Sequence, residues 1–199
     1  MQLFFSPASP FARKVRIVII EKQLTERVQL IACTPYENPP DLLRANPLGK
    51  IPALVLDNGF ALFDSPVICE YLESLNPTPR LIPEVGAERW LVLRAQALAD
   101  GMLDAAVLQV MESRRPEAER SPAAVAHWRT QMLRALAEMD TQLPQIPGAL
   151  NLGQIAFASG LGYLDLRFPQ LNWRATHPAL AAWFAAISQR ESLRATEPH

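Results

Sequence analysis

Apolar and polar residues follow two different periods along this chain, and the change comes near residue 80. In the first part, the short run "QLFF" and the better alternating "RVQLIA" predict β-strands, because a strand points successive side chains to opposite faces. Between them the pattern predicts a helix from Pro10 to Lys22. This helix should begin after Ser9, since serine is favoured at the N-cap and proline at the first helical position.

A hairpin is the clearest local prediction. The segment "PALVLDNGFALF" places Asn58-Gly59 between two apolar runs, which is a strong turn signal between paired strands. A helix should follow in "DSPVICEYLESL", with Ser65 at its N-cap and Pro66 at N1; because N3 would then be Ile68, no capping box forms. The order strand, helix, strand, an irregular stretch, then strand, strand, helix predicts a small mixed sheet with a right-handed parallel pair.

The second part of the chain is predicted to be helical. The segment "NPTPRLIPEVGAE" at 76–88 carries three prolines and is typical of a linker. After it, apolar residues recur at helical spacing, which favours a bundle of amphipathic helices. These residues are Val125, Trp128, Met132, Leu136, Met139 and Leu143, and later Leu180, Trp183, Phe184 and Ile187.

Composition excludes several classes of function. The 199 residues are 49% hydrophobic and 20% charged with a net charge of -1, which provides no attraction to nucleic acid or to an anionic membrane. The two cysteines form no CxxC motif and the three histidines lack the spacing of metal ligands, so we expect a reducing compartment and no metal. We find no signal-peptide pattern, and the longest uncharged stretch, 141–164, contains prolines and glycines. A cytoplasmic protein is therefore expected.

Three short pieces of the first part carry chemical meaning, and each also has a purely structural interpretation. The hydroxyl of Ser9, at a helix N-terminus, can donate to an anion or can simply cap the helix. Pro52 either opens a strand or follows a cis peptide bond, which would leave the backbone of Ile51 facing an extended peptide. Asp64 could bind an ammonium group while the N-terminus of the helix that follows binds a carboxylate, an arrangement that suits the zwitterionic end of an amino acid. Alternatively, Asp64 and Ser65 could form an ordinary helix cap.

Taken in this order, "SPF", "NPLGKIPAL", the Asp-Ser pair, the proline-rich linker and the helical second half resemble the cytosolic glutathione S-transferase family. Further matching segments are "LADGMLDAA" (98–106), "LGYLDLRFP" (161–169) and "HPALAAWFAAISQR" (177–190). The similarity covers nearly the whole chain and is strongest to bacterial branches of unassigned class. It implies a thioredoxin-like α/β domain (β-α-β-α-β-β-α) over residues 1–78, a linker over 79–86 and an all-helical domain over 87–199.

The resemblance also implies a set of site residues. Ser9 takes the catalytic position, and Pro52 takes that of a cis-proline beside which Ile51 pairs with the cysteinyl part of glutathione. The other glutathione-binding residues would be Asp64 and Ser65 at the γ-glutamyl end and Lys50, with Arg13, at the glycyl carboxylate. Asp100 would extend across a homodimer toward the partner subunit's glutathione. An apolar pocket for a small hydrophobic electrophile would be lined by Phe11, Tyr36 and Met102.

The implied activity is a transferase that activates the thiol of glutathione, its co-substrate, for attack on an electrophile. Lowering a thiol pKa by about 2 units takes about 2.7 kcal/mol. A hydrogen bond to a charged acceptor contributes about 1.5–3 kcal/mol and a helix N-terminus about 0.3–1 kcal/mol more, so Ser9 and its helix are about sufficient. Serine rather than cysteine at this position favours conjugation over disulfide exchange. Two alternatives remain open: a non-catalytic binding or regulatory protein of the same architecture, and a glutathione-dependent isomerase or dehalogenase.

The chain departs from the family pattern at one helix start. Many relatives have Ser/Thr-x-x-Asp there, whereas this chain has Asn151-Leu152-Gly153-Gln154. Because asparagine can cap a helix and glutamine can close a capping box, we expect the helix to form. We also expect Cys69 to be buried and inert, since it falls on the apolar face of its helix.

Overall fold

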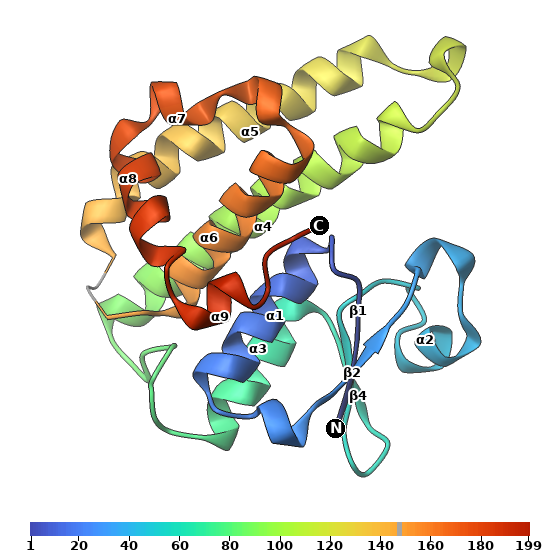
Figure 1. The fold of residues 1–199 in the computed structure, drawn as a ribbon, viewed down its shortest axis with the longest axis vertical. Helices are drawn as coiled ribbons and strands as arrows, with labels where there is room; N and C mark the ends of the chain where they lie inside the picture. The colour runs from blue at the N-terminus through green and yellow to red at the C-terminus, as the bar shows by residue number, and fades with distance from the viewer. Residues whose placement is uncertain (147–148) are drawn as a thin grey trace. The chain divides into compact units, whose positions relative to one another are not determined.

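The computed structural model describes residues 1–146 and 149–199, and contacts within the chain divide it into two compact units (Figure 1). The first unit consists of Met1–Ile82 together with Arg190–His199, and the second of Pro83–Gln189. The prediction of a helical domain over 87–199 therefore needs correction at its end, because the last ten residues pack with the first unit. We call Arg190–His199 the return segment.

A four-stranded sheet organises the first unit, with its strands in the order β2-β1-β3-β4. β1 pairs in parallel with β2, and the pairs β1–β3 and β3–β4 are antiparallel, as the predicted mixed sheet requires. The strands are β1 (Gln2–Phe5), β2 (Gln29–Ala32), β3 (Ala53–Val55) and β4 (Ala61–Leu62). The predicted hairpin between β3 and β4 is confirmed, and Gly59 adopts the positive φ of 83° that its turn requires.

Helices cover both faces of this sheet (Figure 1). α1 and α3 pack together on one face, while α2 lies on the other, where Leu42 and Ala45 form an apolar cluster with Phe4 and Ala53. The helices of this unit are α1 (Pro10–Glu21), α2 (Pro40–Ala45), α3 (Ser65–Leu75) and, in the return segment, α9 (Glu191–Arg194), with 3₁₀ turns at Thr25–Arg27 and Pro35–Glu37. When the two 3₁₀ turns are set aside, the first seven strands and α-helices follow the predicted thioredoxin-like order, β-α-β-α-β-β-α.

The second unit is helical in the part that the structure describes. Its elements are α4 (Ala87–Ser113), α5 (Pro122–Gln142), α6 (Leu152–Arg167), α7 (Trp173–Thr176) and α8 (Pro178–Ile187), with 3₁₀ turns at Glu117–Glu119, Leu143–Gln145 and Pro169–Leu171. α6 is the core helix, since all of its residues from Leu152 to Leu164 are buried. The capping box expected at its start is confirmed: the N–H of Gln154 donates to Asn151 Oδ1 at 3.1 Å, and the N–H of Asn151 donates to Gln154 Oε1 at 3.2 Å.

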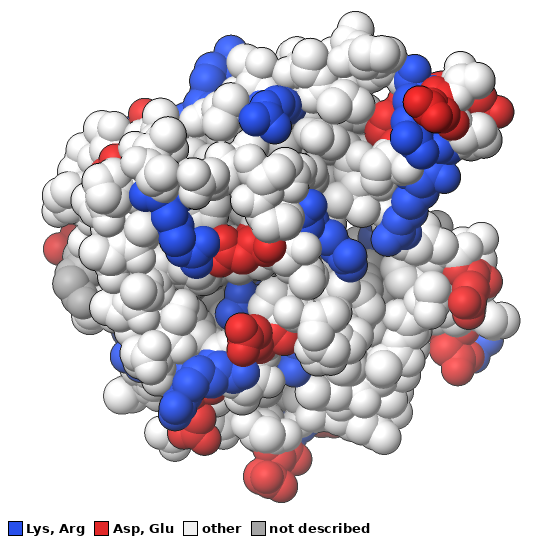
Figure 2. All heavy atoms as spheres, turned by 45° about the horizontal axis from the view of Figure 1, so that its top comes forward, with Lys and Arg blue, Asp and Glu red and all other residues white. Residues whose placement is uncertain are grey.

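Charged side chains of both signs are interspersed among uncharged ones on the face drawn in Figure 2. This mixture agrees with the small net charge of the sequence. Across residues 1–146 and 149–199, none of the helices combines the length and the apolar character that crossing a bilayer demands.

Candidate functional site

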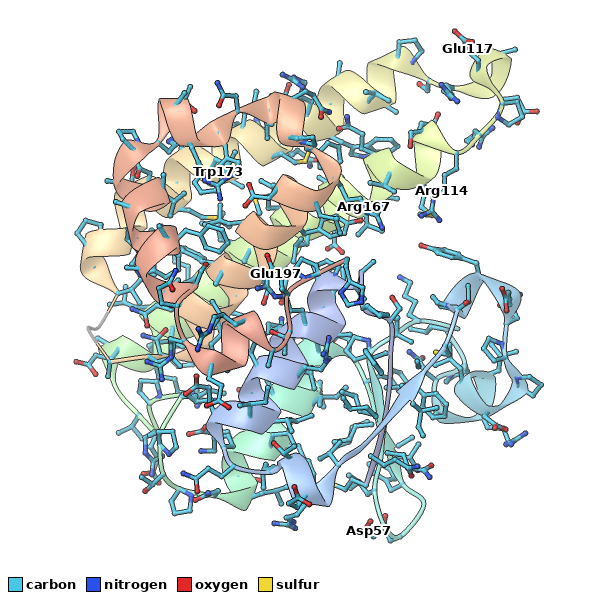
Figure 3. The ribbon with its side chains drawn as sticks, in the orientation of Figure 1. Asp57, Arg114, Glu117, Arg167, Trp173 and Glu197 are labelled. Carbon is cyan, nitrogen blue, oxygen red and sulfur yellow. The ribbon has the colours of Figure 1, made fainter. Side chains whose placement is uncertain are left out.

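Strand register brings the predicted site residues of the first unit to one edge of the sheet. Phe4 lies opposite Ala53 and Leu54 opposite Leu62, so Ser6, the Ile51-Pro52 pair and Asp64 all come within two residues of paired positions at the same end of the sheet. Neighbouring strands lie about 5 Å apart, so the edge from the end of β1 to the start of α3 spans about 10 Å. The β3–β4 hairpin tip, marked by Asp57 in Figure 3, lies at the opposite end of the sheet.

Ser9 caps α1 at this edge. Its N–H donates to the carbonyl of Ser6 at 3.1 Å, which closes the turn after β1, and its Oγ accepts a hydrogen bond from the N–H of Ala12 at 3.2 Å. The hydroxyl therefore acts as an acceptor within the helix cap, and its proton remains available for a further acceptor. Pro10 at N1 has no N–H, and the N–H of Phe11 donates to no group among the described residues.

The Ile51–Pro52 peptide bond is cis, as the resemblance implied. Neither the N–H nor the carbonyl of Ile51 forms a hydrogen bond with the residues that the structure describes, so this backbone is available to an extended peptide. Lys50 precedes it with an exposed side chain that forms no ion pair in the described ranges.

Asn46 shapes the loop before Pro52 and was missed by the sequence prediction. It is 2% exposed, its Nδ2 donates to the carbonyl of Lys50 at 2.8 Å, and its Oδ1 accepts from the N–H of Leu48 at 3.0 Å. Asparagine commonly organises turns in this way, so the "NPLG" sequence held the signal. Gly49, with φ of 63°, completes the turn.

The start of α3 differs by one residue from the prediction. Asp64, not Ser65, is the N-cap, with Ser65 at N1 and Pro66 at N2. Asp64 makes no side-chain cap, and the N–H groups of Ser65 and Val67 find no acceptor within 1–146 or 149–199. An anion can occupy such a helix terminus. The side chain of Ser65 is at the same place, only 1% exposed, with a hydroxyl that bonds to no described residue.

Arg13 is not at this edge. It is 3% exposed, and its Nη2 donates to the carbonyl of Leu193 in the return segment at 3.2 Å. Its predicted place at the glycyl carboxylate therefore needs correction: packing against the return segment turns the side chain away. Two further residues were predicted for the apolar pocket. Phe11 is half-buried in α1, and Tyr36, in the turn after β2, is 61% exposed.

Asp100 and Met102 belong to the second unit. Met102 is 1% exposed, and its Cε lies 2.8 Å from where a Cβ on Gly160 would be, so it is a core residue between α4 and α6 rather than a wall of an open pocket. The carboxylate of Asp100 accepts a hydrogen bond from the side chain of Gln96 at 3.5 Å.

The two cysteines differ in their place. Cys33 follows β2 at the same end of the sheet as the site, since Ala32 pairs with Phe5, whereas Cys69 lies inside α3. Cys69 is 1% exposed, which confirms its predicted burial. Burial raises the pKa of the Cys33 thiol, although a hydrogen bond from the backbone of Phe5 to this side chain opposes the rise. A high pKa disfavours the reactive thiolate. No group of three or more metal-ligating side chains gathers among the described residues.

Comparison with known proteins assigns the family. The pattern of the glutathione S-transferase N-terminal domain matches residues 8–75, and that of the C-terminal domain matches residues 122–186. The chain is 36% identical over 203 residues to the uncharacterized GST-like protein YibF of Escherichia coli K12, covering 100% of this chain and 98% of that protein. The chain belongs to the glutathione S-transferase family.

Two further relatives of this family member bear on its chemistry. A crystal structure of a glutathione transferase family member from Pseudomonas fluorescens Pf-5, with bound glutathione, is 42% identical with a TM-score of 0.96, covering 100% of this chain and 98% of that one. A maleylacetoacetate isomerase from Pseudomonas aeruginosa is 30% identical over 146 residues, covering 70% of this chain and 69% of that protein.

Proposed function

We propose that this chain binds glutathione along the sheet edge and that Ser9 activates the glutathione thiol for attack on a small hydrophobic electrophile. One observation carries the proposal: three groups with unused hydrogen-bonding capacity, at Ser9, Ile51 and Asp64-Ser65, share an edge about 10 Å long. An extended tripeptide has about this length, since each residue spans about 3.3 Å. The bound glutathione of the Pseudomonas fluorescens relative supports the same ligand here.

Groups of opposite charge beside this edge give the ligand a direction. The uncapped start of α3 and the Ser65 hydroxyl suit the γ-glutamyl carboxylate, and the exposed Asp64 carboxylate suits the ammonium group beside it. The backbone of Ile51 pairs with the cysteinyl residue, and Lys50 is the cation for the glycyl carboxylate. This orientation brings the cysteinyl sulfur toward the start of α1.

Ser9 can cap α1 and activate the thiol at once. Its oxygen accepts from Ala12, so its proton is free to donate to the sulfur. Such a bond is stronger to a thiolate than to a thiol, and the positive end of α1 favours the same anion. The interaction therefore stabilises the reactive form more than the resting one, which is the condition for raising the rate.

The remaining parts of the proposal concern the electrophile and the assembly. We assign Phe11 and Tyr36 to the apolar surface that receives the electrophile, and leave Met102 in the helical core. We also propose a homodimer in which Asp100 extends toward the partner subunit's glutathione, as the family resemblance implies.

Titration calorimetry with glutathione tests the binding, followed by loss of free thiol in the presence of a panel of electrophiles. Saturable binding with one site per chain and electrophile-dependent thiol consumption support the proposal. Absence of heat and of any thermal shift at millimolar glutathione contradicts it.

The similarity to a maleylacetoacetate isomerase favours a second candidate, glutathione-dependent isomerisation. The two reactions differ in their balance: conjugation consumes one thiol for each product, whereas isomerisation releases glutathione unchanged. Counting free thiols before and after turnover distinguishes them.

A further inference from the structure

The return segment lies along α1, the helix that carries Ser9 at its N-cap, as Figure 1 shows for α9. Two nitrogens of Arg190 donate to the carboxylate of Glu21 at 3.0 and 2.9 Å, and the hydroxyl of Ser192 donates to the same carboxylate at 2.5 Å. Glu21 is the last residue of α1. We call this set of hydrogen bonds to Glu21 the first anchor of the return segment. It lies at the opposite end of α1 from Ser9.

The second anchor is near the N-terminus of α1. Arg13 Nη2 donates to the carbonyl of Leu193 at 3.2 Å, and Arg16 Nη2 donates to that of Ala195 at 3.4 Å. Arg13 and Glu21 are eight residues apart, or about 12 Å along a helix. The side of the segment that meets the helix is tightly packed, because Leu193 and Thr196 are each 1% exposed.

The charged side chains at these two anchors are not expected to add much to the free energy of unfolding. Arg13 is one turn from Ser9, and the backbone N–H of Arg13 donates to the Ser9 carbonyl at 2.9 Å. A cation this close to a helix N-terminus interacts unfavourably with the helix dipole. Burying a guanidinium also has a desolvation cost. The Arg190 side chain is 46% exposed and that of Glu21 12%, so solvent screens their attraction and its contribution to stability is small. What the two parallel hydrogen bonds supply is a defined geometry between the return segment and α1.

We propose that Glu21 and Arg190 are positioning residues for the thiol chemistry. Through the return segment they hold α1 at one axial position, and thereby hold the Ser9 hydroxyl where it meets the glutathione sulfur. The turn that joins β1 to Ser9 restrains the start of the helix. Its other end is held on the side of α3 by the ion pair of Lys22 with Glu73 at 2.9 Å, and on the side of the return segment by the Glu21 anchor. This inference rests on the proposed function and extends it to residues remote from the sheet edge.

The test compares Glu21→Gln and Arg190→Met with wild type by titrating the ultraviolet absorbance of the thiolate of bound glutathione against pH. We expect glutathione affinity within about threefold of wild type and a titration midpoint higher by about 0.5 pH units or more, because small displacements weaken a hydrogen bond steeply. The double variant should equal either single variant, as expected for one interaction. Arg190→Lys retains the charge but cannot form two parallel hydrogen bonds with Glu21. Its titration midpoint should therefore fall between those of wild type and Arg190→Met.

A matched control is the pair of Arg174 and Asp165 in the second unit, which is also bidentate. Arg174→Met should lower the melting temperature without moving the thiolate titration. Unchanged midpoints in Glu21→Gln, Arg190→Met and Arg190→Lys, measured where each is folded, would overturn the inference while leaving the proposed function intact. Equal shifts in Arg174→Met would also overturn it, because they would indicate general destabilisation. A wild-type protein that binds no glutathione would overturn both.

Discussion

The oxygen of Ser9 accepts a hydrogen bond from the N–H of Ala12 at 3.2 Å, so the proposed catalytic hydroxyl is also a helix cap. The chain repeats this arrangement at α5, where Ser121 precedes Pro122 and its oxygen accepts from the N–H of Ala124 at 3.3 Å. The two caps share sequence pattern and geometry, but only the first is at the sheet edge. The second therefore measures what capping alone contributes.

Ser9→Ala should retain most glutathione affinity but slow turnover about ten- to a hundredfold near neutral pH, because it removes about 1.5–3 kcal/mol of thiolate stabilisation. The thiolate absorbance of bound glutathione, titrated in both proteins, measures the effect directly. Ser121→Ala is the control: it should lose about 1 kcal/mol of unfolding free energy with no change in the thiolate titration. If Ser9→Ala and wild type titrate together, Ser9 is only a cap.

Asp64→Asn and Ser65→Ala should each weaken glutathione binding about tenfold or more, since each removes a charge-assisted contact at the γ-glutamyl end. The measurement is the rise in melting temperature at a fixed glutathione concentration, which depends on the ratio of ligand concentration to Kd.

Two variants in the same unit control for nonspecific effects on that rise. Ser74→Ala changes a hydroxyl that bonds to Tyr71 within α3, and Asp57→Asn changes a carboxylate at the opposite end of the sheet. Both should keep the full glutathione-dependent rise. A full rise in Asp64→Asn and Ser65→Ala would contradict the assignment of this end.

Gly153→Ala should destabilise the second unit by about 1–3 kcal/mol through overpacking. A Cβ at Gly153 would lie 2.8 Å from the Cβ of Ala95 and 3.0 Å from the carbonyl oxygen of Val92, so α4 and α6 must separate. Gly101→Ala, in α4, is the control because nothing lies within 4 Å of its added Cβ. It should be neutral or stabilising by up to about 1 kcal/mol, as alanine favours helix. Urea midpoints that are equal for both variants would refute the close packing.

Stability should fall in acid partly because Glu21 becomes protonated. Burial by itself would raise the pKa of Glu21, but the hydrogen bonds from Arg190 and Ser192 and the charge of Arg190 hold it below its ordinary value. Because the folded state binds this proton less readily than the unfolded state, the contribution is present above the ordinary pKa of about 4.3 and is lost as pH falls through the lower folded value. Unfolding free energy should therefore fall more steeply with decreasing pH in wild type than in Glu21→Gln. Parallel curves would contradict the prediction.

Light scattering at micromolar concentration should report about twice the chain mass of 22.1 kDa if the protein is the proposed homodimer. Asp100→Ala should then weaken glutathione binding without changing the measured mass. A mass of one chain would refute both the dimer and the role of Asp100 across it.

Much of this protein was predictable from short-range patterns in its sequence. The Ser9 cap, the hairpin at Asn58-Gly59 and the Asn151–Gln154 capping box each depend on hydrogen bonds between residues at most a few positions apart. Such bonds need only the right side chain at the right offset, so the sequence contains all the information. The cis bond before Pro52 came instead from the family resemblance, since spacing alone favours trans.

Tertiary structure decided the features that depend on distant parts of the chain. Arg13 was expected at the ligand. Instead its guanidinium donates a hydrogen bond to the carbonyl of Leu193, which lies 180 residues later in the return segment. Met102 was expected to line a pocket, but the absence of a side chain at Gly160 lets α6 approach and bury it. Both outcomes depend on which surfaces meet after folding, and a pattern along the chain records the apolar faces of elements without recording their partners.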